Sequence, residues 1–216
     1  MQTEFAREQM ISQQIRAWDV LDERVLEALR RVPREQFVPE KYVDLAFADA
    51  EIPLGKGRHM LPPNIVGRIL QALQATPGTR ALVVGSGTGY VAACLSAMGA
   101  SVRGIEIDPE LAASSRANLK RTGFGQVDVV TGDTFHLDPG SGYAVIAVCG
   151  SLPLYTDRFA RALAVGGKLF VVVGPARLQE ALLVTRTAES QWTSTGLFET
   201  VIDALENAPR PEPFQF

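Results

Sequence analysis

Arg80-Ala-Leu-Val-Val-Gly-Ser-Gly-Thr-Gly-Tyr90 is the stretch of sequence that decides the fold of this chain. A short apolar run ends in three glycines at alternate positions, and residues 91–98 continue with a helical pattern. This order predicts a buried strand, a glycine turn and a helix. The glycines allow a sharp turn and bring a ligand against the main chain without Cβ atoms in the way. The N-terminus of the following helix presents free N–H groups to that ligand.

Two acids are predicted to follow the next two strands. Residues 101–106 read as a strand that ends in Glu106, about 20 residues past the loop, where nucleotide-binding βαβ units place an acid that binds ribose hydroxyls. Residues 127–131 read as a third strand, which leads into Gly132 and Asp133. The Asp133 carboxylate is placed to accept a hydrogen bond from an adenine amino group. The alternative is a turn residue that caps the end of the strand.

The glycine spacing discriminates between two nucleotide cofactors. A dinucleotide site has the pattern G-x-G-x-x-G, in which the third glycine allows close helix–strand packing. Here the glycines stand at every second position, which is typical of methyltransferases that use S-adenosyl-L-methionine. We therefore expect S-adenosyl-L-methionine as the cofactor, with S-adenosyl-L-homocysteine as its product.

The alternation of strands and helices predicts the fold class. From residue 80 onward it indicates an α/β, Rossmann-like, S-adenosylmethionine-dependent methyltransferase fold with helices on both faces of a mostly parallel sheet. Residues 181–187 and 195–202 add an antiparallel pair at one edge, which makes seven strands. The remaining expected strands are 80–84, 143–148 and 168–173, and the expected helices are 89–98, 109–121 and 155–163.

One domain is expected, in three parts. Residues 1–63 form N-terminal helices and a substrate loop, residues 64–176 the cofactor-binding core, and residues 177–216 the edge strands and an extended tail. Residues 4–31 are helical in pattern, and the second helix there is capped near Asp19 or Asp22. A helix over 64–75 is capped by Asn64, and residues 46–63 form a long ordered loop. Phe214 and Phe216 are candidates to anchor the tail.

Composition excludes several classes of protein. The net charge is −3, which gives no electrostatic case for nucleic acid or an anionic membrane surface. No apolar run approaches a membrane span, and the first residues lack the pattern of a signal peptide, so a cytoplasmic protein is expected. Cys94 and Cys149 are predicted to be buried small hydrophobes, and the two histidines give no metal site. The oligomeric state stays open.

Over residues 8–174 the chain resembles the protein-L-isoaspartate (D-aspartate) O-methyltransferases. The matches include Met10-Ile-Ser-Gln-Gln-Ile15, Val32-Pro-Arg-Glu-Gln-Phe-Val-Pro39, Ile52-Pro-Leu-Gly55 and Leu163-Ala-Val-Gly-Gly-Lys-Leu169. The N-terminal pattern is far more specific than the glycine loop, which many methyltransferase families share. The resemblance implies methyl transfer to a carboxylate oxygen of isoaspartyl residues in a protein or peptide substrate, as part of protein repair. With the glycine loop and the two acids, it implies a cofactor site built from Gly85, Ser86, Gly87, Thr88, Gly89, Tyr90, Glu106, Ile107, Gly132, Asp133, Thr134, His59, Met60 and Leu61.

The sequence departs from the family pattern at positions that bear on the substrate. Leu61 stands where the family has a serine in its substrate loop, and His59 stands where it has a threonine. Val83 and Ala144 replace two acids, one before the glycine loop and one near the start of the fourth strand. We therefore expect the fold and the cofactor site to persist and isoaspartyl activity to be poor. A methyltransferase for another acceptor, including a small molecule, and a non-catalytic cofactor-binding scaffold are the alternatives.

Arg58 and His59 are the only candidates for catalytic residues in the substrate loop. A guanidinium matches the fork of a carboxylate, and an imidazole can exchange a proton near neutral pH. Each could equally be a loop side chain without a chemical role, so the sequence leaves the catalytic residues undetermined.

Overall fold

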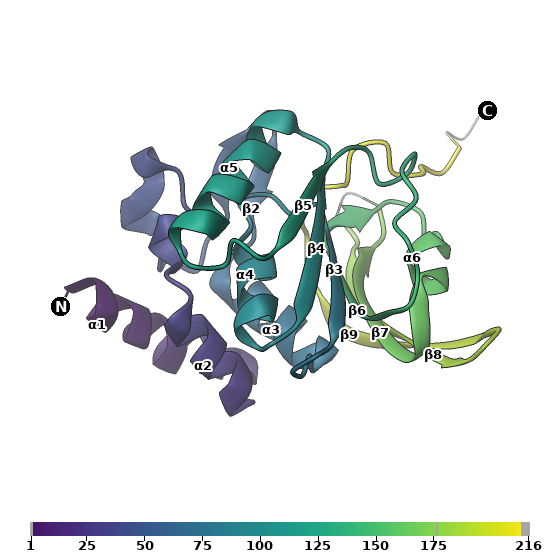
Figure 1. The fold of residues 1–216 in the computed structure, drawn as a ribbon, viewed down its shortest axis with the longest axis horizontal. Coiled ribbons are helices and arrows are strands. Elements are labelled where there is room, and N and C mark those ends of the chain that lie inside the picture. Colours follow the sequence, from purple (N-terminus) through teal and green to yellow (C-terminus); the bar gives the residue numbers. More distant parts are fainter. Residues whose placement is uncertain (1, 176, 213–216) are drawn as a thin grey trace.

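The computed structural model describes residues 2–175 and 177–212. Seven strands form one sheet in the order β5-β4-β3-β6-β7-β8-β9 (Figure 1). Neighbours from β5 to β7 run parallel, whereas β8 is antiparallel to β7 and β9 is antiparallel to β8. The bounds are β3 (Arg80–Val84), β4 (Ser101–Glu106), β5 (Asp128–Thr131), β6 (Tyr143–Leu152), β7 (Leu163–Val173), β8 (Glu180–Ala188) and β9 (Gln191–Glu199). The predicted fold class and the antiparallel edge pair are confirmed.

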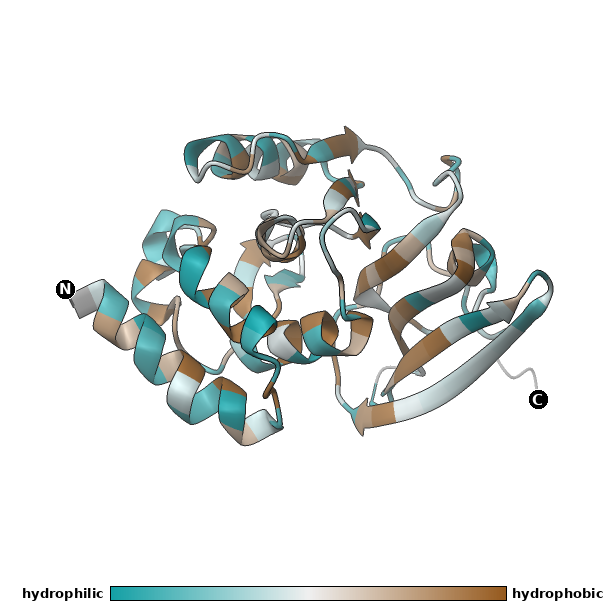
Figure 2. Cartoon of the chain, turned by 60° about the horizontal axis from the view of Figure 1, so that its bottom comes forward, coloured by the Kyte–Doolittle hydropathy of each residue, from teal (hydrophilic) through white to brown (hydrophobic). Residues whose placement is uncertain are grey.

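Both faces of the sheet are buried, because successive side chains of a strand point to opposite sides. On β3, Ala81 and Val83 enter one core and Leu82 and Val84 enter the other. The first core is covered by α2 (Glu23–Arg31), α3 (Pro63–Leu73), α4 (Tyr90–Ala97) and α5 (Pro109–Arg121). The second is covered by the short α6 (Arg158–Arg161) and by loop residues such as Phe135 and Leu205. Figure 2 shows hydrophobic residues along the strands and hydrophilic residues on the outer helix surfaces.

The N-terminal extension is helical but interrupted. Helix α1 (Gln2–Gln9) runs into a π-helix (Met10–Ile15) and a 3₁₀ turn (Arg16–Trp18), and α2 follows after a short loop. Asp22 is the N-cap of α2, and its side chain accepts a hydrogen bond of 2.9 Å from the backbone N–H of Arg24. Asp19, the other candidate cap, instead has a left-handed backbone at the end of the 3₁₀ turn. Two further 3₁₀ segments, Arg34–Gln36 and Glu40–Leu45, lead toward the sheet.

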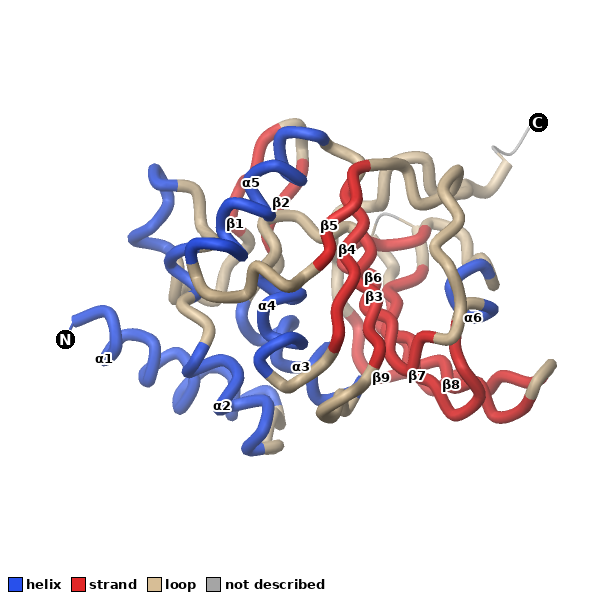
Figure 3. Tube along the Cα trace, viewed as in Figure 1, coloured by secondary structure: helices blue, strands red, loops and turns tan. Residues whose placement is uncertain are grey.

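The long connection before α3 is ordered, as expected, and contains a hairpin that the sequence did not predict. Strands β1 (Ile52–Gly55) and β2 (Arg58–Met60) pair antiparallel apart from the main sheet (Figure 3). The predicted cap of α3 is wrong, because Pro62 occupies the cap position and Asn64 lies within the first turn. Proline at the start of a helix needs no N–H partner, which explains the earlier start.

Several boundaries differ from those expected. Strands β6 and β7 are longer than predicted and α6 is shorter, while β9 begins at Gln191 rather than near residue 195. An exposed edge strand such as β9 carries polar residues, so its hydrophobic pattern marks its start poorly. Phe214 and Phe216, the expected tail anchors, lie outside the described residues. Within the described ranges no helix is long and apolar enough to cross a membrane, and no three metal-ligating side chains gather.

Candidate functional site

The candidate site lies at the carboxyl ends of the parallel strands. Strand β3 is flanked by β4 on one side and by β6 on the other, so the strand order reverses at β3. In open α/β sheets this switch point is where ligands bind. The glycine loop follows β3, Glu106 ends β4 and Asp133 follows β5. The topology therefore brings the predicted loop and both predicted acids to one edge of the sheet.

The glycine loop requires glycine at each of its three positions. Gly85, Gly87 and Gly89 have φ of +70°, +55° and +92°, in the left-handed region that other residues rarely adopt. A Cβ on Gly89 would lie 2.6 Å from Ser115 Oγ, so Gly89 serves the packing of α4 on α5. A Cβ on Gly87 would face Leu54 at 3.7 Å, across the cavity described below. Gly87 is therefore the glycine whose missing side chain leaves room for a ligand.

Glu106 is buried and braces the loop. One carboxylate oxygen accepts a hydrogen bond of 2.7 Å from Gly87 N–H, and the other accepts one of 3.1 Å from Asp108 N–H. Only 4% of the surface of Glu106 is exposed to solvent. Each carboxylate oxygen has a second lone pair, so Glu106 can accept further hydrogen bonds from a ligand hydroxyl. Ile107 links Glu106 to Asp108 along the chain without lining the cavity.

Asp133 forms a turn after β5 and is held by three partners. Its Oδ1 accepts a 2.8 Å bond from Phe135 N–H, and its Oδ2 accepts bonds from Asn207 Nδ2 at 2.8 Å and His136 Nδ1 at 2.6 Å. Burial raises the pKa of this carboxyl, but the bonds from Phe135, Asn207 and His136 outweigh burial and leave the pKa below its ordinary value. Asp133 therefore does act as a turn residue at the end of the strand, the alternative considered in the sequence analysis. Neighbouring Gly132 donates to the Glu106 carbonyl at 2.8 Å.

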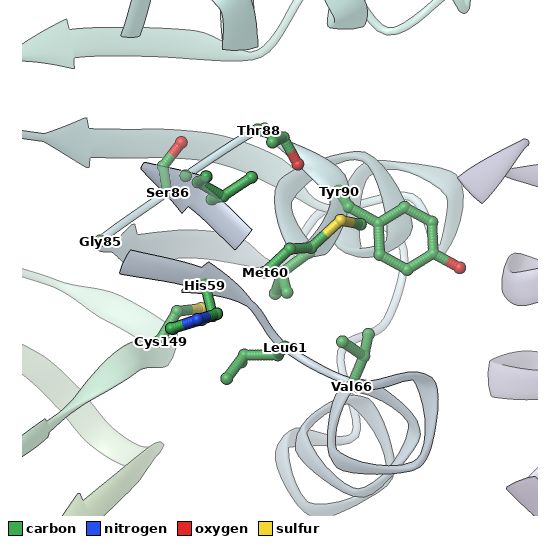
Figure 4. Close-up of a pocket in the computed structure, with 12 residues that line it drawn as sticks. His59, Met60, Leu61, Val66, Gly85, Ser86, Thr88, Tyr90 and Cys149 are labelled. Atoms are coloured by element: carbon green, nitrogen blue, oxygen red, sulfur yellow. The ribbon is translucent and has the colours of Figure 1, made fainter. Parts of the chain in front are cut away.

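A small cavity of about 40 Å³ lies between the glycine loop and the hairpin. Figure 4 shows His59 beside Cys149 and below Ser86, with Leu61 and Val66 lower still, on the side away from Ser86 and Thr88. The predicted residues Gly85 to Thr88, Tyr90, His59, Met60 and Leu61 meet around this cavity. The other predicted residues do not line it, namely Gly89, Glu106, Ile107, Gly132, Asp133 and Thr134. The Oγ1 atom of Thr134 is buried without a partner among the described residues. Leu54, Val66 and Cys149 line the cavity in addition.

Ion pairs fasten the hairpin over the cavity. Lys56 Nζ and Arg58 Nη1 both lie 2.6 Å from Asp108 Oδ2, and Arg58 also pairs with Glu206. The bond from Lys56, followed by that from Arg58, holds the pKa of Asp108 well below its usual range. Arg58, a candidate to bind a substrate carboxylate, is therefore already engaged by two carboxylates of the protein.

His59, the second candidate, is held by the C-terminal segment. Its Nδ1 lies 2.8 Å from Asp203 Oδ2, and about one third of each side chain is exposed (34% and 37%). Glu51 lies close to this pair. Burial, followed by the charge of Asp203, raises the pKa of Glu51. Two carboxylates, those of Asp203 and Glu51, therefore lie near the imidazole.

The positions that depart from the family pattern are accommodated by packing. Val83 is fully buried in the first core, where an acid would need a partner. Ala144 is half-buried near the start of β6.

Cys94 and Cys149 are free thiols whose burial raises their pKa to about 12, so neither is a ready nucleophile. Cys94 is a buried small hydrophobe as predicted, whereas Cys149 is partly exposed and lines the cavity.

The contribution of the C-terminal segment to the site was not predicted from the sequence. Asp203, Glu206 and Asn207 reach the hairpin and the β5 turn only through tertiary packing, after the chain returns from β9. No motif or spacing marks these three residues. Asp108 carried a readable signal, because an aspartate before Pro109 is a typical helix cap, and it does accept bonds from the N–H groups of Glu110 and Leu111.

Comparisons with known proteins agree with this architecture. Residues 5–205 match the model of the protein-L-isoaspartate(D-aspartate) O-methyltransferase family. A protein-L-isoaspartate O-methyltransferase of Koribacter versatilis is 39% identical over 183 residues, which cover 84% of this chain and 82% of that protein. A second, from Marinobacter nauticus, is 40% identical over 188 residues and 86% of each chain.

The fold is shared with solved structures as well. A crystal structure from Plasmodium falciparum, described as a protein-L-isoaspartate O-methyltransferase in complex with S-adenosyl-L-homocysteine, superposes with a TM-score of 0.80. It is 19% identical, and the match covers 94% of this chain and 98% of that one. The residues matched by the family model, 5–205, include the glycine loop, the hairpin and both acids. The chain belongs to the protein-L-isoaspartate(D-aspartate) O-methyltransferase family.

Proposed function

We propose that this protein binds S-adenosyl-L-methionine at the glycine loop and transfers its methyl group to an oxygen acceptor. The observation that carries the proposal is the pairing of Glu106 with Gly87. A buried carboxylate braces the loop, keeps lone pairs for a ligand, and stands beside a glycine whose missing Cβ leaves space in the cavity. Family membership supports the same chemistry.

The proposed cofactor contacts follow from donor and acceptor chemistry. Glu106 would accept hydrogen bonds from the ribose hydroxyls, and Asp133 one from the adenine amino group. The remaining residues would enclose the ligand, namely Gly85, Ser86, Gly87, Thr88, Gly89, Tyr90, Ile107, Gly132, Thr134, His59, Met60 and Leu61. The cavity of about 40 Å³ is smaller than the roughly 300–1,000 Å³ of typical small-molecule pockets. The hairpin β1–β2 would therefore move outward when the cofactor enters.

Alignment and exclusion of water would supply most of the rate enhancement. The bound cofactor provides an electrophilic methyl group, and the hairpin would hold the acceptor in line with it and away from solvent. For the isoaspartyl carboxylate, on which the related proteins act by name, no base would be needed. Leu61 offers no hydroxyl to such a carboxylate, so we propose that this protein methylates isoaspartyl residues poorly. The free thiols of Cys94 and Cys149 support a reducing, cytoplasmic location.

A non-catalytic scaffold that only binds the cofactor is the second candidate. The apolar residues Val83 and Ala144, at positions where the family has acids, favour it. Calorimetric titration with S-adenosyl-L-homocysteine tests binding, and formation of that product from S-adenosyl-L-methionine tests catalysis. Absence of binding would overturn the proposal, and binding without turnover on any acceptor, including protein extract, would favour the scaffold.

A further inference from the structure

A histidine–aspartate pair stands at the edge of the cavity, where the family has a threonine. His59 Nδ1 lies 2.8 Å from Asp203 Oδ2, so the imidazole donates its Nδ1 proton to the carboxylate. The neutral ring then carries a lone pair on Nε2. Among the described residues Nε2 has no hydrogen-bond partner, and His59 lines the cavity together with Gly85 and Gly87 (Figure 4). A carboxylate that fixes the tautomer of a histidine is the arrangement that general bases use.

The surroundings of His59 disfavour an anionic acceptor. Glu51 and Asp203 lie near His59, and Arg58 on the same strand is engaged by Asp108 and Glu206. Leu61 replaces the serine that would hold a carboxylate. A substrate carboxylate would therefore lie near two protein carboxylates, and no cationic side chain of the hairpin would be free to pair with it. It would also gain nothing from a general base, since it carries no proton at neutral pH.

A second pocket is lined by Asp203 of this pair, whereas His59 is not among its lining residues. It encloses about 570 Å³, begins at Glu51 and Asp203, and continues to Arg210, the one basic side chain among its lining residues. Much of the remaining lining is apolar, including Pro153, Pro175, Val201, Ile202 and Pro211, and the polar Ser151 and Gln179 also contribute. The volume lies within the range of small-molecule pockets, and such a lining suits an aromatic ring.

From the pair and the pocket we infer that His59 is the general base for methylation of a phenolic hydroxyl on a neutral or cationic molecule. A phenol fits better than an aliphatic alcohol because its hydroxyl gives up a proton far more readily to an imidazole. The phenol oxygen forms the O–CH₃ bond while the S–CH₃ bond of S-adenosyl-L-methionine breaks, and that electron pair stays on the sulfur of S-adenosyl-L-homocysteine. The hydroxyl proton moves to His59 Nε2 and then to water. Asp203 is the positioning residue.

This inference rests on the proposed function, and calorimetry with S-adenosyl-L-homocysteine separates the two. Three acceptors are compared in the presence of S-adenosyl-L-methionine: tyramine, N-acetylserinamide and an isoaspartyl tripeptide. We expect tyramine to be methylated at least about tenfold faster than the other two, with a kcat that falls as the pH is lowered. If the protein binds S-adenosyl-L-homocysteine but leaves tyramine unmodified, or prefers the isoaspartyl tripeptide or N-acetylserinamide, the phenol assignment is wrong while the proposed cofactor site stands.

Variants test the base itself. His59→Gln should lower kcat for tyramine about 100-fold or more and flatten its pH profile, because general-base catalysis contributes on that scale. Affinity for S-adenosyl-L-homocysteine should change little, and added imidazole should restore activity to His59→Gly. Lys41→Gln is the control, at an exposed side chain outside the site, and should retain full kcat. An unchanged kcat in His59→Gln would overturn the role.

An acceptor-independent measurement completes the test. Nitrogen-15 NMR of the two imidazoles, assigned with His136→Gln, reports the tautomer of His59 directly. We expect the Nδ1–H form in the parent protein, and a shift toward the Nε2–H form in Asp203→Asn together with a lower kcat. A dominant Nε2–H form in the parent would contradict the geometry required of a base.

Discussion

Replacing Glu106 by glutamine tests the cofactor assignment and the bracing of the glycine loop together. The carboxylate accepts one bond from Gly87 N–H at 2.7 Å and one from Asp108 N–H at 3.1 Å, and the residue is buried. Glutamine keeps one acceptor oxygen, but its NH₂ group must face one of these two N–H donors. One bond is therefore lost and the other loses the assistance of the charge.

The magnitude follows from these two bonds. Hydrogen bonds to charged groups contribute about 1.5–3 kcal/mol each, so Glu106→Gln should destabilise the free protein by about 2–3 kcal/mol. For a domain of this size that lowers Tm by roughly 4–12 °C. Loss of the carboxylate that would bind ribose should also weaken the binding of S-adenosyl-L-homocysteine by about 1.5–3 kcal/mol, or about 10- to 150-fold in Kd.

Thermal unfolding and calorimetric titration measure the two effects separately. Glu110→Gln is the matched control, since that carboxylate stands on the adjoining helix with 84% of its side chain exposed. It should change Tm and Kd little. If Glu106→Gln lowers Tm but leaves the Kd unchanged, Glu106 only braces the loop and the ribose lies elsewhere. If neither quantity changes, both parts of the reasoning are wrong.

Three further outcomes are expected. Asp133→Asn should weaken S-adenosyl-L-homocysteine by about tenfold, because an amide offers one acceptor in place of two; an unchanged Kd with a large loss of stability would leave Asp133 a purely structural turn residue. Isoaspartyl peptide should be a poor substrate, since a substrate carboxylate without a partner costs about 1–3 kcal/mol. The double change His59→Thr with Leu61→Ser should therefore raise its methylation about tenfold or more. No gain would show that the missing loop hydroxyls are not the cause of the poor activity. The stability difference between the parent and Asp108→Asn in urea denaturation should be constant from pH 7 to 5. It should shrink as the pH falls below about 4. Folding lowers the pKa of Asp108, so its carboxylate contributes its full stabilisation only above the pKa of the unfolded state. That contribution is lost as the pH falls from there toward the pKa of the folded state. A difference that persists undiminished at pH 3 would contradict the ion pairs with Asp108.

Local patterns predicted the cofactor half of the molecule well. Strands β3 and β4 and helix α5 have the expected bounds, because Gly85 follows the apolar run of β3, Pro109 begins α5, and β4 lies between Gly99 and Pro109. Glu106 at the end of β4 and Gly87 in the loop could be placed together because parallel strands bring their carboxyl ends to one edge. These predictions needed only residues close in sequence.

The acceptor half could not be predicted in the same way. The contact of His59 with Asp203 spans 144 positions, and that of Arg58 with Glu206 spans 148. Neither pair has a spacing that sequence periodicity could reveal, since both arise when the segment after β9 folds back over the sheet. The hairpin was missed for a related reason. Its strands are short, and its turn uses a left-handed Lys56, which no preference rule favours.

Calorimetric titration of S-adenosyl-L-homocysteine into the parent and Gly87→Ala tests the cofactor site most directly. The added Cβ would face Leu54 at 3.7 Å, in space that the folded chain leaves open and the cofactor would fill. Gly123→Ala is the control, with a similar left-handed backbone (φ +85°) and no atom within 4 Å of the new Cβ. We predict one bound ligand per parent chain, Kd at least about tenfold weaker in Gly87→Ala, and no change in Gly123→Ala. No binding by the parent, or equal binding by Gly87→Ala, would contradict a cofactor site at the glycine loop.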